Sequence, residues 1–160
     1  MHTIRFATRE DVPALVGLIR ELAEHEKLGH LVEATPELLE PQLFGVRPGA
    51  ECLVAEREGA LDGFALFFHN FSTFLSRRGL YLEDLYVKPA QRGQGLGARL
   101  LSELARLAVE RDCGRFEWSV LDWNTDAQAF YAHMGARMLP DWRICRITGD
   151  ALRELASGTR

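Results

Sequence analysis

Three glycines alternate with other residues near the middle of the chain, between an apolar strand-like run and an amphipathic helical pattern. They are Gly93, Gly95 and Gly97, and Arg92 stands just before them. Glycine lets the backbone adopt conformations barred to other residues and come close to a ligand. A helix that begins after such a turn offers unpaired N–H groups and the positive end of its dipole, which suit a phosphate group. Arg92 adds a guanidinium that can bond two phosphate oxygens. The segment is therefore a candidate phosphate-binding turn.

Two other interpretations of this turn are open. In one, it is a tight strand-to-helix connection without a ligand, although so many glycines carry an entropic cost with no evident structural need. In the other, Gly93, Gly95 and Ala98 form the G-x-G-x-x-G/A fingerprint of a dinucleotide fold. The context disfavours that fold, because only about 60 residues follow the turn. The preceding strand also carries Glu83 and Asp84, where a continuous apolar strand is usual.

The composition is that of one ordinary globular domain. The chain has 160 residues, of which 47% are hydrophobic and 26% charged, and we expect a single domain over residues 1–160. Nineteen Lys and Arg against 23 Asp and Glu leave a net charge of -4. A mildly acidic chain is a poor general binder of nucleic acid, whose affinity rests on phosphate neutralisation. It is better suited to a cationic partner.

The lack of recognisable targeting features in this sequence and its cysteine usage favour a cytoplasmic protein without a membrane partner. No run approaches the ~18 apolar residues of a membrane helix, and the N-terminus lacks a basic lead and an apolar stretch. Cys52, Cys113 and Cys145 are odd in number and far apart. They fit neither a disulfide framework nor a paired zinc spacing. We expect three buried or half-buried thiols and no metal.

The periodicity predicts a mixed α+β sheet covered by helices, with antiparallel hairpins in the first half and strand–helix–strand units in the second. Thr8 stands three residues before Asp11 as a plausible helix cap. The predicted strands cover residues 3–7, 52–57, 61–70, 80–87, 115–121 and 142–148. The predicted helices cover residues 12–25, 36–44, 95–111 and 124–134, with a short helical tail after Asp150.

Arg92-x-x-Gly95-x-Gly97 resembles the R/Q-x-x-G-x-G/A signature of the GNAT superfamily of N-acetyltransferases, and the order of elements resembles that fold from end to end. Within the superfamily the chain is similar to the diamine (spermidine/spermine) N-acetyltransferases and their bacterial relatives. The densest match is Tyr-Leu-Glu-Asp-Leu-Tyr-Val at residues 81–87. The resemblance implies the GNAT fold, with a central mixed, mostly antiparallel sheet flanked by helices. It also implies acetyl-CoA as the acetyl donor and a homodimer.

This resemblance implies a binding site for acetyl-CoA. Backbone groups of Leu85, Tyr86 and Val87 should pair with the acetyl and pantetheine part, and Asn124 should touch the pantetheine arm. Backbone N–H groups of the glycine turn should hold the pyrophosphate, beside the guanidinium of Arg92. The residues of that turn are Gly93, Gln94, Gly95, Leu96, Gly97 and Ala98.

The resemblance also implies the residues that handle the amine. Tyr131 would be the general acid, and Glu83 the base, acting directly or through water. A bulge in the strand, which the family carries here, could aim both Glu83 and Asp84 toward the amine. The amine pocket would comprise His25, Glu26, Glu83, Asp84 and Trp142.

These roles fit the chemistry of amine acetylation by a thioester, which needs no covalent intermediate when both reactants are held in line. An alkyl ammonium has a pKa near ~10, so about one molecule in a thousand is nucleophilic at pH 7. A carboxylate can bind the cation and take its proton. The departing thiolate needs a proton, since a thiol pKa is near ~8.5, and a phenol such as Tyr131 is protonated at pH 7.

Each candidate also has a structural interpretation. Tyr131 could be an aromatic packed at a helix end, and Trp142 a core or interface aromatic. Glu83 and Asp84 could be a solvated strand end, as His25 and Glu26 could be a solvated helix end. A catalytically silent CoA-binding module, a sensor or partner, is the alternative function.

Two departures weaken the resemblance to polyamine acetylases. Pro140 stands two residues before Trp142, where the family has an acid, and Arg77 and Arg78 add positive charge. A diamine, a lysine-like amino acid, an aminoglycoside-like cation and a peptide amine all remain candidate substrates.

Overall fold

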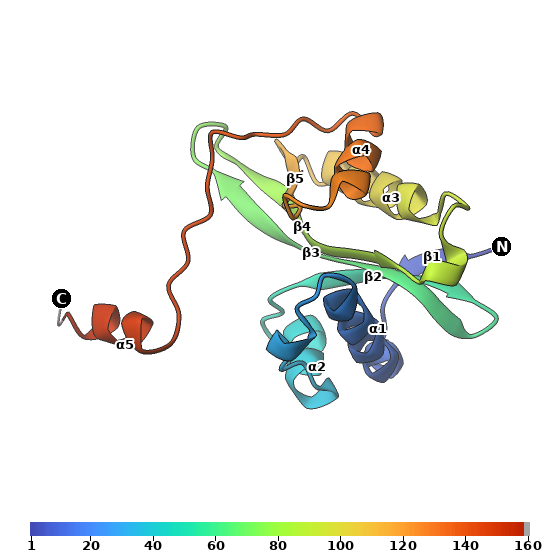
Figure 1. Cartoon of the computed structure of the whole chain (residues 1–160), viewed down its shortest axis with the longest axis horizontal. Helices are drawn as coiled ribbons and strands as arrows, with labels where there is room; N and C mark the ends of the chain where they lie inside the picture. The colour runs from blue at the N-terminus through green and yellow to red at the C-terminus, as the bar shows by residue number, and fades with distance from the viewer. Residues whose placement is uncertain (159–160) are drawn as a thin grey trace. The chain divides into compact units, whose positions relative to one another are not determined.

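A five-stranded sheet is the centre of the molecule in the computed structural model, which describes residues 1–158 (Figure 1). The strand order is β1-β2-β3-β4-β5. The first four strands are antiparallel neighbours, and β5 runs parallel to β4. This confirms the predicted mixed, mostly antiparallel sheet. The strands are β1 (Thr3–Phe6), β2 (Glu51–Arg57), β3 (Ala60–Ser72), β4 (Arg77–Val87) and β5 (Phe116–Trp118).

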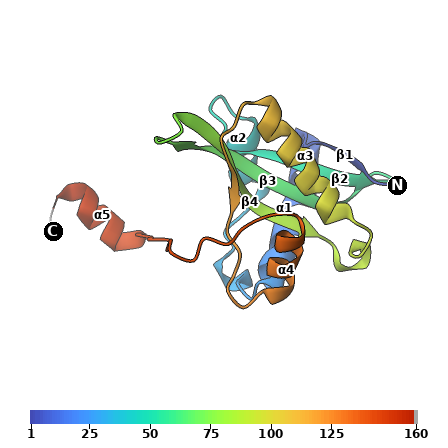
Figure 2. The ribbon, with the colours of Figure 1, turned by 90° about the horizontal axis from the view of Figure 1, so that it is seen from above.

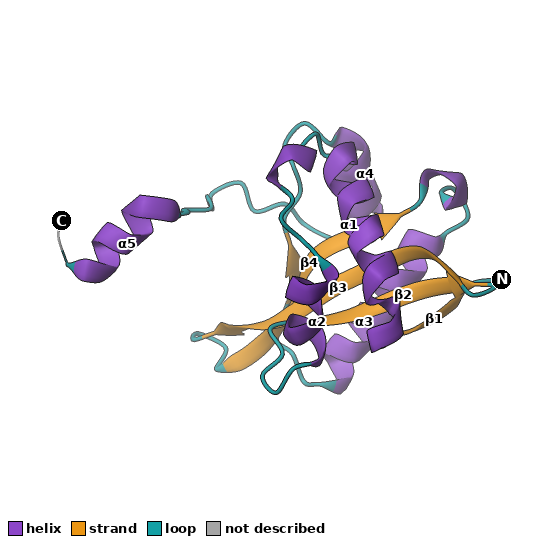
Figure 3. Ribbon diagram, turned by 90° about the horizontal axis from the view of Figure 1, so that it is seen from below, coloured by secondary structure: helices purple, strands orange, loops and turns teal. Residues whose placement is uncertain are grey.

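Helices cover both faces of this sheet (Figures 2 and 3). α1 (Val12–His25) and α2 (Pro36–Phe44) lie on one face, and α3 (Leu96–Glu110) lies on the other. Leucines recur at helical spacing and become the buried stripes, as Leu15 and Leu18 do in α1 and Leu100 and Leu104 do in α3. Burial of each such side chain stabilises the fold by roughly 1.5–3 kcal/mol.

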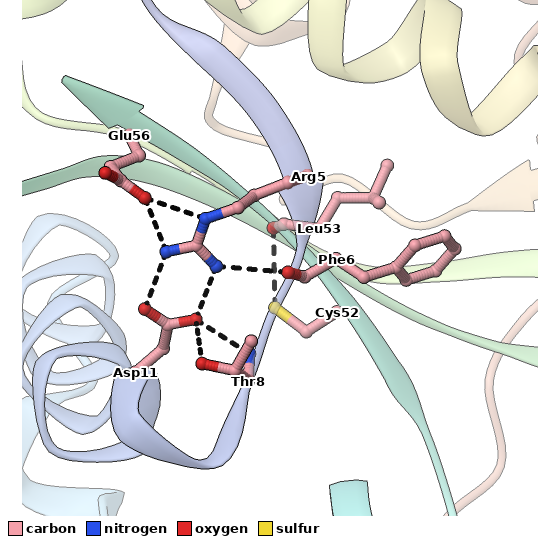
Figure 4. Close-up of polar contacts among 7 residues, drawn as sticks. All are labelled: Arg5, Phe6, Thr8, Asp11, Cys52, Leu53 and Glu56. Atoms are coloured by element: carbon pink, nitrogen blue, oxygen red, sulfur yellow. Dashed lines mark hydrogen bonds and ion pairs between the residues drawn. The ribbon is translucent and has the colours of Figure 1, made fainter. Parts of the chain in front are cut away.

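Arg5 joins β1 to β2 and to the start of α1 (Figure 4). Its Nε donates to Glu56 Oε2 at 2.7 Å, and its two terminal nitrogens donate to the carboxylate of Asp11 at 2.7 and 3.0 Å. The backbone N–H of Thr8 donates to Asp11 Oδ2 at 2.7 Å. The hydrogen bond from Arg5 is the largest cause of the lowered pKa of Asp11. Thr8 is the N-cap of the short 3-10 turn Arg9–Asp11, and Asp11 is the N-cap of α1, so the predicted cap lies one turn before the α-helix itself.

The second hairpin is longer than the sequence pattern predicted. β3 and β4 stay paired from Gly63↔Val87 to Ser72↔Arg77, although the predicted strands ended at residue 70 and began at residue 80. Ser76 adopts φ 49° in the tight turn between them. β5 is shorter than predicted, because only Phe116, Glu117 and Trp118 find partners on β4.

Residues 1–121 form one compact unit, and the residues from Asp122 onward form a second unit. The second unit contains α4 (Thr125–His133) and α5 (Gly149–Ser157), which confirm the predicted helix at 124–134 and the helical tail. The assignment of residues 1–160 to a single domain stays a prediction.

The predicted final strand at residues 142–148 is wrong, because this segment has no regular secondary structure. Its alternation of apolar residues suits a strand, but a strand also needs a neighbour for its backbone groups. Trp142 is 80% exposed and Ile144 is 73% exposed. Cys145 is also exposed, which corrects the expectation that all three thiols are buried or half-buried. Among residues 1–158, no helix is long and apolar enough to cross a membrane.

Candidate active site

The glycine turn joins the end of β4 to the start of α3, as the sequence predicted. Gly93 and Gly95 have φ of 77° and 76°, in the left-handed region that favours glycine. A Cβ at either position would meet no atom within 4 Å. These glycines are therefore needed for their backbone conformation rather than for lack of space, and the turn is open to an approaching ligand.

The first turn of α3 has N–H groups that need an acceptor. The helix begins at Leu96 with Gly95 as its N-cap, and its backbone bonding starts with Arg99 N–H donating to Gly95 O at 3.0 Å. The earlier N–H groups have no partner within the helix. A glycine cap has no side chain that could accept from them, as Ser or Asp would. This end of α3 therefore suits an anion, and its use for pyrophosphate stays a prediction.

Arg92 is held close to the strand that precedes the turn. Its Nε donates to Val87 O at 2.8 Å, and its guanidinium carbon lies 5.6 Å from the centre of the Tyr86 ring. The bond to Val87 uses one of the five N–H donors of the guanidinium. The sequence predicted that this side chain can bond phosphate, and the structure adds these two contacts within the protein.

A β-bulge interrupts β4 at Glu83. Leu66 of β3 pairs with Asp84 and the adjacent Phe67 pairs with Leu82, so Glu83 is the extra residue. Cross-strand partners lie on the same face of a sheet, and adjacent residues lie on opposite faces. The bulge therefore places Asp84 on the opposite face from Leu82, although the two are only two residues apart. This is the bulge that the family resemblance implied.

Three carboxylates gather around this bulge. The pKa of Asp84 is raised to about 6, first by burial and then by the charges of Glu83 and Glu26. Glu26 follows α1 directly, and burial also raises its pKa, against the opposing charge of His25. Among residues 1–158, neither Asp84 nor Glu83 has a side-chain hydrogen bond or ion pair with the protein. The arrangement is an acidic site with unmet negative charge, as a cation-binding site requires.

The edge of β4 that faces β5 is open beyond the bulge. β5 pairs with Leu80, Tyr81 and Leu82 only, and no other strand among residues 1–158 takes this edge further along. Residues 85–87 stay paired with β3 on their other side. Unpaired backbone groups at a strand edge can bond an extended ligand. The predicted use of these residues for the pantetheine arm fits this opening.

Three predicted site residues belong to the second unit. Asn124 is the N-cap of α4, and its Oδ1 accepts from Ala127 N–H at 3.2 Å. Tyr131 lies in the last turns of α4, with its ring centre 5.4 Å from that of Phe130. Trp142 lies in the irregular segment before α5. Asn124 thus stands at the start of the predicted helix, and the roles of these residues toward substrates stay predictions.

Sequence reasoning missed Glu21 of α1. Its Oε2 accepts a hydrogen bond from the Tyr86 hydroxyl at 3.1 Å. The two residues are 65 positions apart, so no local spacing could have related them. Among residues 1–158 there is no group of three or more His, Cys, Asp or Glu side chains that could hold a metal ion.

A model of the acetyltransferase (GNAT) family matches residues 17–136 of the chain. The thialysine N-epsilon-acetyltransferase of Sus scrofa is 40% identical over 96% of this chain and 96% of its own length. The L-ornithine N5-acetyltransferase of Arabidopsis thaliana is 34% identical over 95% of this chain and 86% of its length. A spermidine/spermine N(1)-acetyltransferase-like protein of Homo sapiens is 32% identical over 96% of this chain and 23% of its length.

The fold also matches solved structures. An integron cassette protein from the mobile metagenome of V. cholerae superposes with a TM-score of 0.82 and 28% identity, covering 97% of each chain. The match extends over nearly all of both chains, which agrees with the element order described above.

Proposed function

The chain belongs to the acetyltransferase (GNAT) family, and from this premise we propose that it transfers acetyl from acetyl-CoA to a primary amine of a small cationic substrate. The relatives are N-acetyltransferases, and the chain is an enzyme that acetylates amines. The family uses acetyl-CoA as its acetyl donor. The observation that carries the proposal is the placement of two features on one strand. β4 bears the acidic bulge and then leads into the glycine turn and α3.

The carboxylates around the bulge would bind the amine as its ammonium ion and then take its proton. At pH 7 the pKa of about 6 leaves Asp84 mostly ionised, so it can hold the cation. Glu83 lies next to it and is exposed, so it can accept the proton directly or through a water molecule. The freed amine nitrogen attacks the thioester carbonyl carbon, and the C–S bond then breaks. Glu26, directly after α1, extends the acidic site, and we assign Glu26 and the adjacent His25 to the amine pocket.

Tyr131 would return a proton to the departing thiolate. A phenol is protonated at pH 7 and can donate to a thiolate. We expect Tyr131→Phe to lower kcat by about a hundredfold while the Kd for CoA changes little, because only the hydroxyl is lost. Stopped-flow turnover and calorimetric CoA titration measure the two quantities. Unchanged turnover would remove Tyr131 from the mechanism.

The substrate class we favour is a lysine-like amino acid with a side-chain amine. The support comes from the relatives, which are named for thialysine and ornithine at 40% and 34% identity. The two departures at Pro140 and at Arg77-Arg78 count against a long polyamine. From the family resemblance we also propose that Asn124 and the backbone of Leu85, Tyr86 and Val87 hold the pantetheine arm, and that Trp142 helps to form the amine pocket.

The test is CoA release from acetyl-CoA against a panel of amines. The panel contains thialysine, ornithine, lysine, putrescine, spermidine, an aminoglycoside and a peptide with a free N-terminus. We expect the highest kcat/KM for thialysine or ornithine. A higher value for spermidine would replace the amino-acid class with polyamines. If no amine in the panel causes CoA release while CoA still raises the melting temperature, the result would instead support a CoA-binding module without transfer.

We also propose a homodimer in the cytoplasm. The irregular segment and α5 expose apolar side chains that a second copy could cover, among them Trp142 at 80% and Leu155 at 55% exposed. Light scattering at micromolar concentration tests this. A monomer there would contradict the dimer.

A further inference from the structure

Contacts among the side chains of Glu21, Tyr86 and Arg92 connect α1 to the glycine turn. Glu21 Oε2 accepts from the Tyr86 hydroxyl at 3.1 Å. The guanidinium carbon of Arg92 lies 5.6 Å from the centre of the Tyr86 ring. Arg92 Nε in turn donates to Val87 O at 2.8 Å. These contacts fix the Arg92 side chain from two directions, at the residue that directly precedes Gly93.

Among these three side chains, Tyr86 is the one that is held in place by the apolar core. It is only 5% exposed and belongs to the apolar core with Leu18, Leu22 and Phe64. Its ring centre lies 6.4 Å from that of Phe64. Burial and the bond to Glu21 raise the pKa of the hydroxyl, against the charge of Arg92. The hydroxyl therefore stays protonated and donates to Glu21, which holds the ring plane beneath the guanidinium.

Holding the Arg92 guanidinium in place before the ligand arrives lowers the entropic cost of binding at this open turn. A free arginine side chain loses rotamer entropy when it binds a ligand, and the glycines around Arg92 offer no side chain that could hold it. Contact with an aromatic face restricts the side chain before the ligand arrives. The bond to Val87 uses Nε only, and the terminal nitrogens are the ones that pair with phosphate oxygens in a forked contact.

We propose that Glu21 and Tyr86 are positioning residues, which hold Arg92 in place to bind the pyrophosphate of the acyl donor. This inference rests on the proposed function, because it takes acetyl-CoA as the ligand of the turn. It deepens that function by naming two residues whose side chains touch neither the donor nor the amine. Under this proposal, Arg92 binds the phosphate end of the donor, and the backbone of β4 binds the thioester end.

The experiment compares donors with and without the pyrophosphate. Tyr86→Phe keeps the ring and removes the hydroxyl, and Glu21→Ala removes the acceptor from an exposed helical position. We expect each change to raise the KM for acetyl-CoA about fivefold. The KM for S-acetyl-pantetheine, which has no pyrophosphate, should stay the same. A purely structural role would shift both donors equally, and that result would overturn the inference.

A double variant and a matched control sharpen the test. In an Arg92→Ala background, Tyr86→Phe should add nothing to the loss for acetyl-CoA, because its effect acts through Arg92. An additional loss would contradict the proposal. Tyr81→Phe is the control, since Tyr81 lies on the same strand and its hydroxyl bonds Ser119 at 2.9 Å instead. It should leave the KM for both donors unchanged.

Calorimetry makes the outcome independent of transfer. The wild type should bind CoA more tightly than pantetheine, and Tyr86→Phe and Glu21→Ala should reduce that preference about fivefold. Binding without transfer to any amine would overturn the proposed activity and leave this inference standing. A wild type that binds CoA no more tightly than pantetheine would overturn the inference, whatever the transfer assay gives.

Discussion

Two β-bulges in the same sheet each place an acidic side chain in a different electrostatic environment. In β3, Ala55 pairs with Gly63 and Glu56 with Leu61, so Asp62 is the extra residue. In β4 the extra residue is Glu83, directly before Asp84. Asp62 is surrounded by cations, whereas Asp84 is surrounded by other carboxylates.

The Asp62 bulge is a closed site. His2 Nε2 lies 2.9 Å from Asp62 Oδ2, Arg57 Nε lies 3.3 Å from the same oxygen, and Lys88 Nζ lies 3.8 Å from Oδ1. Burial acts to raise the pKa of Asp62, but the hydrogen bond from His2 and the charges of Arg57 and Lys88 outweigh it and lower the pKa. The carboxylate thereby ties together the N-terminus, the end of β2 and the residue after β4.

The Asp84 bulge is an open site. Burial and the charges of Glu83 and Glu26 all raise the pKa of Asp84, to about 6. No cation among residues 1–158 bonds this carboxylate, so its charge destabilises the free protein and favours a bound cation. The comparison teaches that a bulge only supplies an acidic position. The neighbours decide whether that position stabilises the fold or serves a ligand.

The largest effect that would sharpen this contrast is expected at Glu83. Glu83→Gln removes the proposed base, so kcat should fall about a hundredfold or more and activity should appear only at higher pH. The urea midpoint should not fall, because Glu83 is exposed and its charge only adds to the repulsion at Asp84. Turnover from pH 6 to pH 10 measures the effect, with Glu58→Gln in the other hairpin as the control. An unchanged pH profile would count against Glu83 as the base.

The closed bulge should lose stability rather than activity. Asp62→Asn leaves buried His2 and its other partners without their anion, and we expect a loss of about 3 kcal/mol in the free energy of unfolding. Urea unfolding at pH 7 measures it. Turnover at saturating substrate and low temperature should be unchanged. Asp112→Asn is the control, because its carboxylate is 84% exposed beside Arg77 and should contribute little.

The direction of the pKa shift of Asp62 predicts how the stability lost in Asp62→Asn depends on pH. The pKa of Asp62 is lowered in the folded state, so its stabilisation is present above the unfolded pKa of about 3.9. It is lost as the pH falls through the lower, folded pKa. The difference between wild type and Asp62→Asn should therefore shrink below about pH 4. A difference that stays constant to pH 2 would show that the charge of Asp62 is not its source.

A smaller effect of opposite sign is expected at Asp84. Because its folded pKa is raised to about 6, the ionised carboxylate reduces stability as the pH rises from the unfolded value through the folded one. Asp84→Asn should therefore increase the free energy of unfolding by roughly 1–2 kcal/mol at pH 8. The KM for the amine should rise at the same time. Urea unfolding at pH 8 and pH 4 tests this, and a gain that persists at pH 4 would contradict the electrostatic cause.

The smallest effect is expected at Lys88. Its Nζ is 3.8 Å from Asp62 Oδ1, and its side chain is 35% exposed. Lys88→Gln should lower stability by about 0.5 kcal/mol or less, measured by urea unfolding beside Asp62→Asn. A loss as large as that of Asp62→Asn would mean that Lys88, and not the buried His2, is the main partner.

The helices and most strands could be predicted from the sequence, because each carries its own apolar period and its own caps. Thr35, which caps α2 by accepting from Leu38 N–H, and the glycines before α3 are local signals of this kind. The segment 142–148 shows where this reasoning fails. Its alternation is as regular as that of a true strand, but no strand among residues 1–158 pairs with it.

The bulge at Glu83 could not be predicted from the residues alone. The sequence Leu82-Glu83-Asp84-Leu85 has no glycine or other local sign of an extra residue, and a regular strand would place Leu82 and Asp84 on one face. The register between β3 and β4 decides otherwise. The bond from Tyr86 to Glu21, 65 positions away, is beyond any local pattern for the same reason.

The types of chemistry in this protein follow from local sequence: a glycine turn ahead of a helix, paired acids on the strand before it, and a mixed sheet to carry them. Short-range preferences for φ, capping and apolar period are properties of neighbouring residues, so one chain suffices to read them. Only the tertiary structure decided which acids are neutralised and which stay charged. That depends on the register of strands and on side chains brought together from distant positions, such as His2 beside Asp62 and Glu26 beside Asp84.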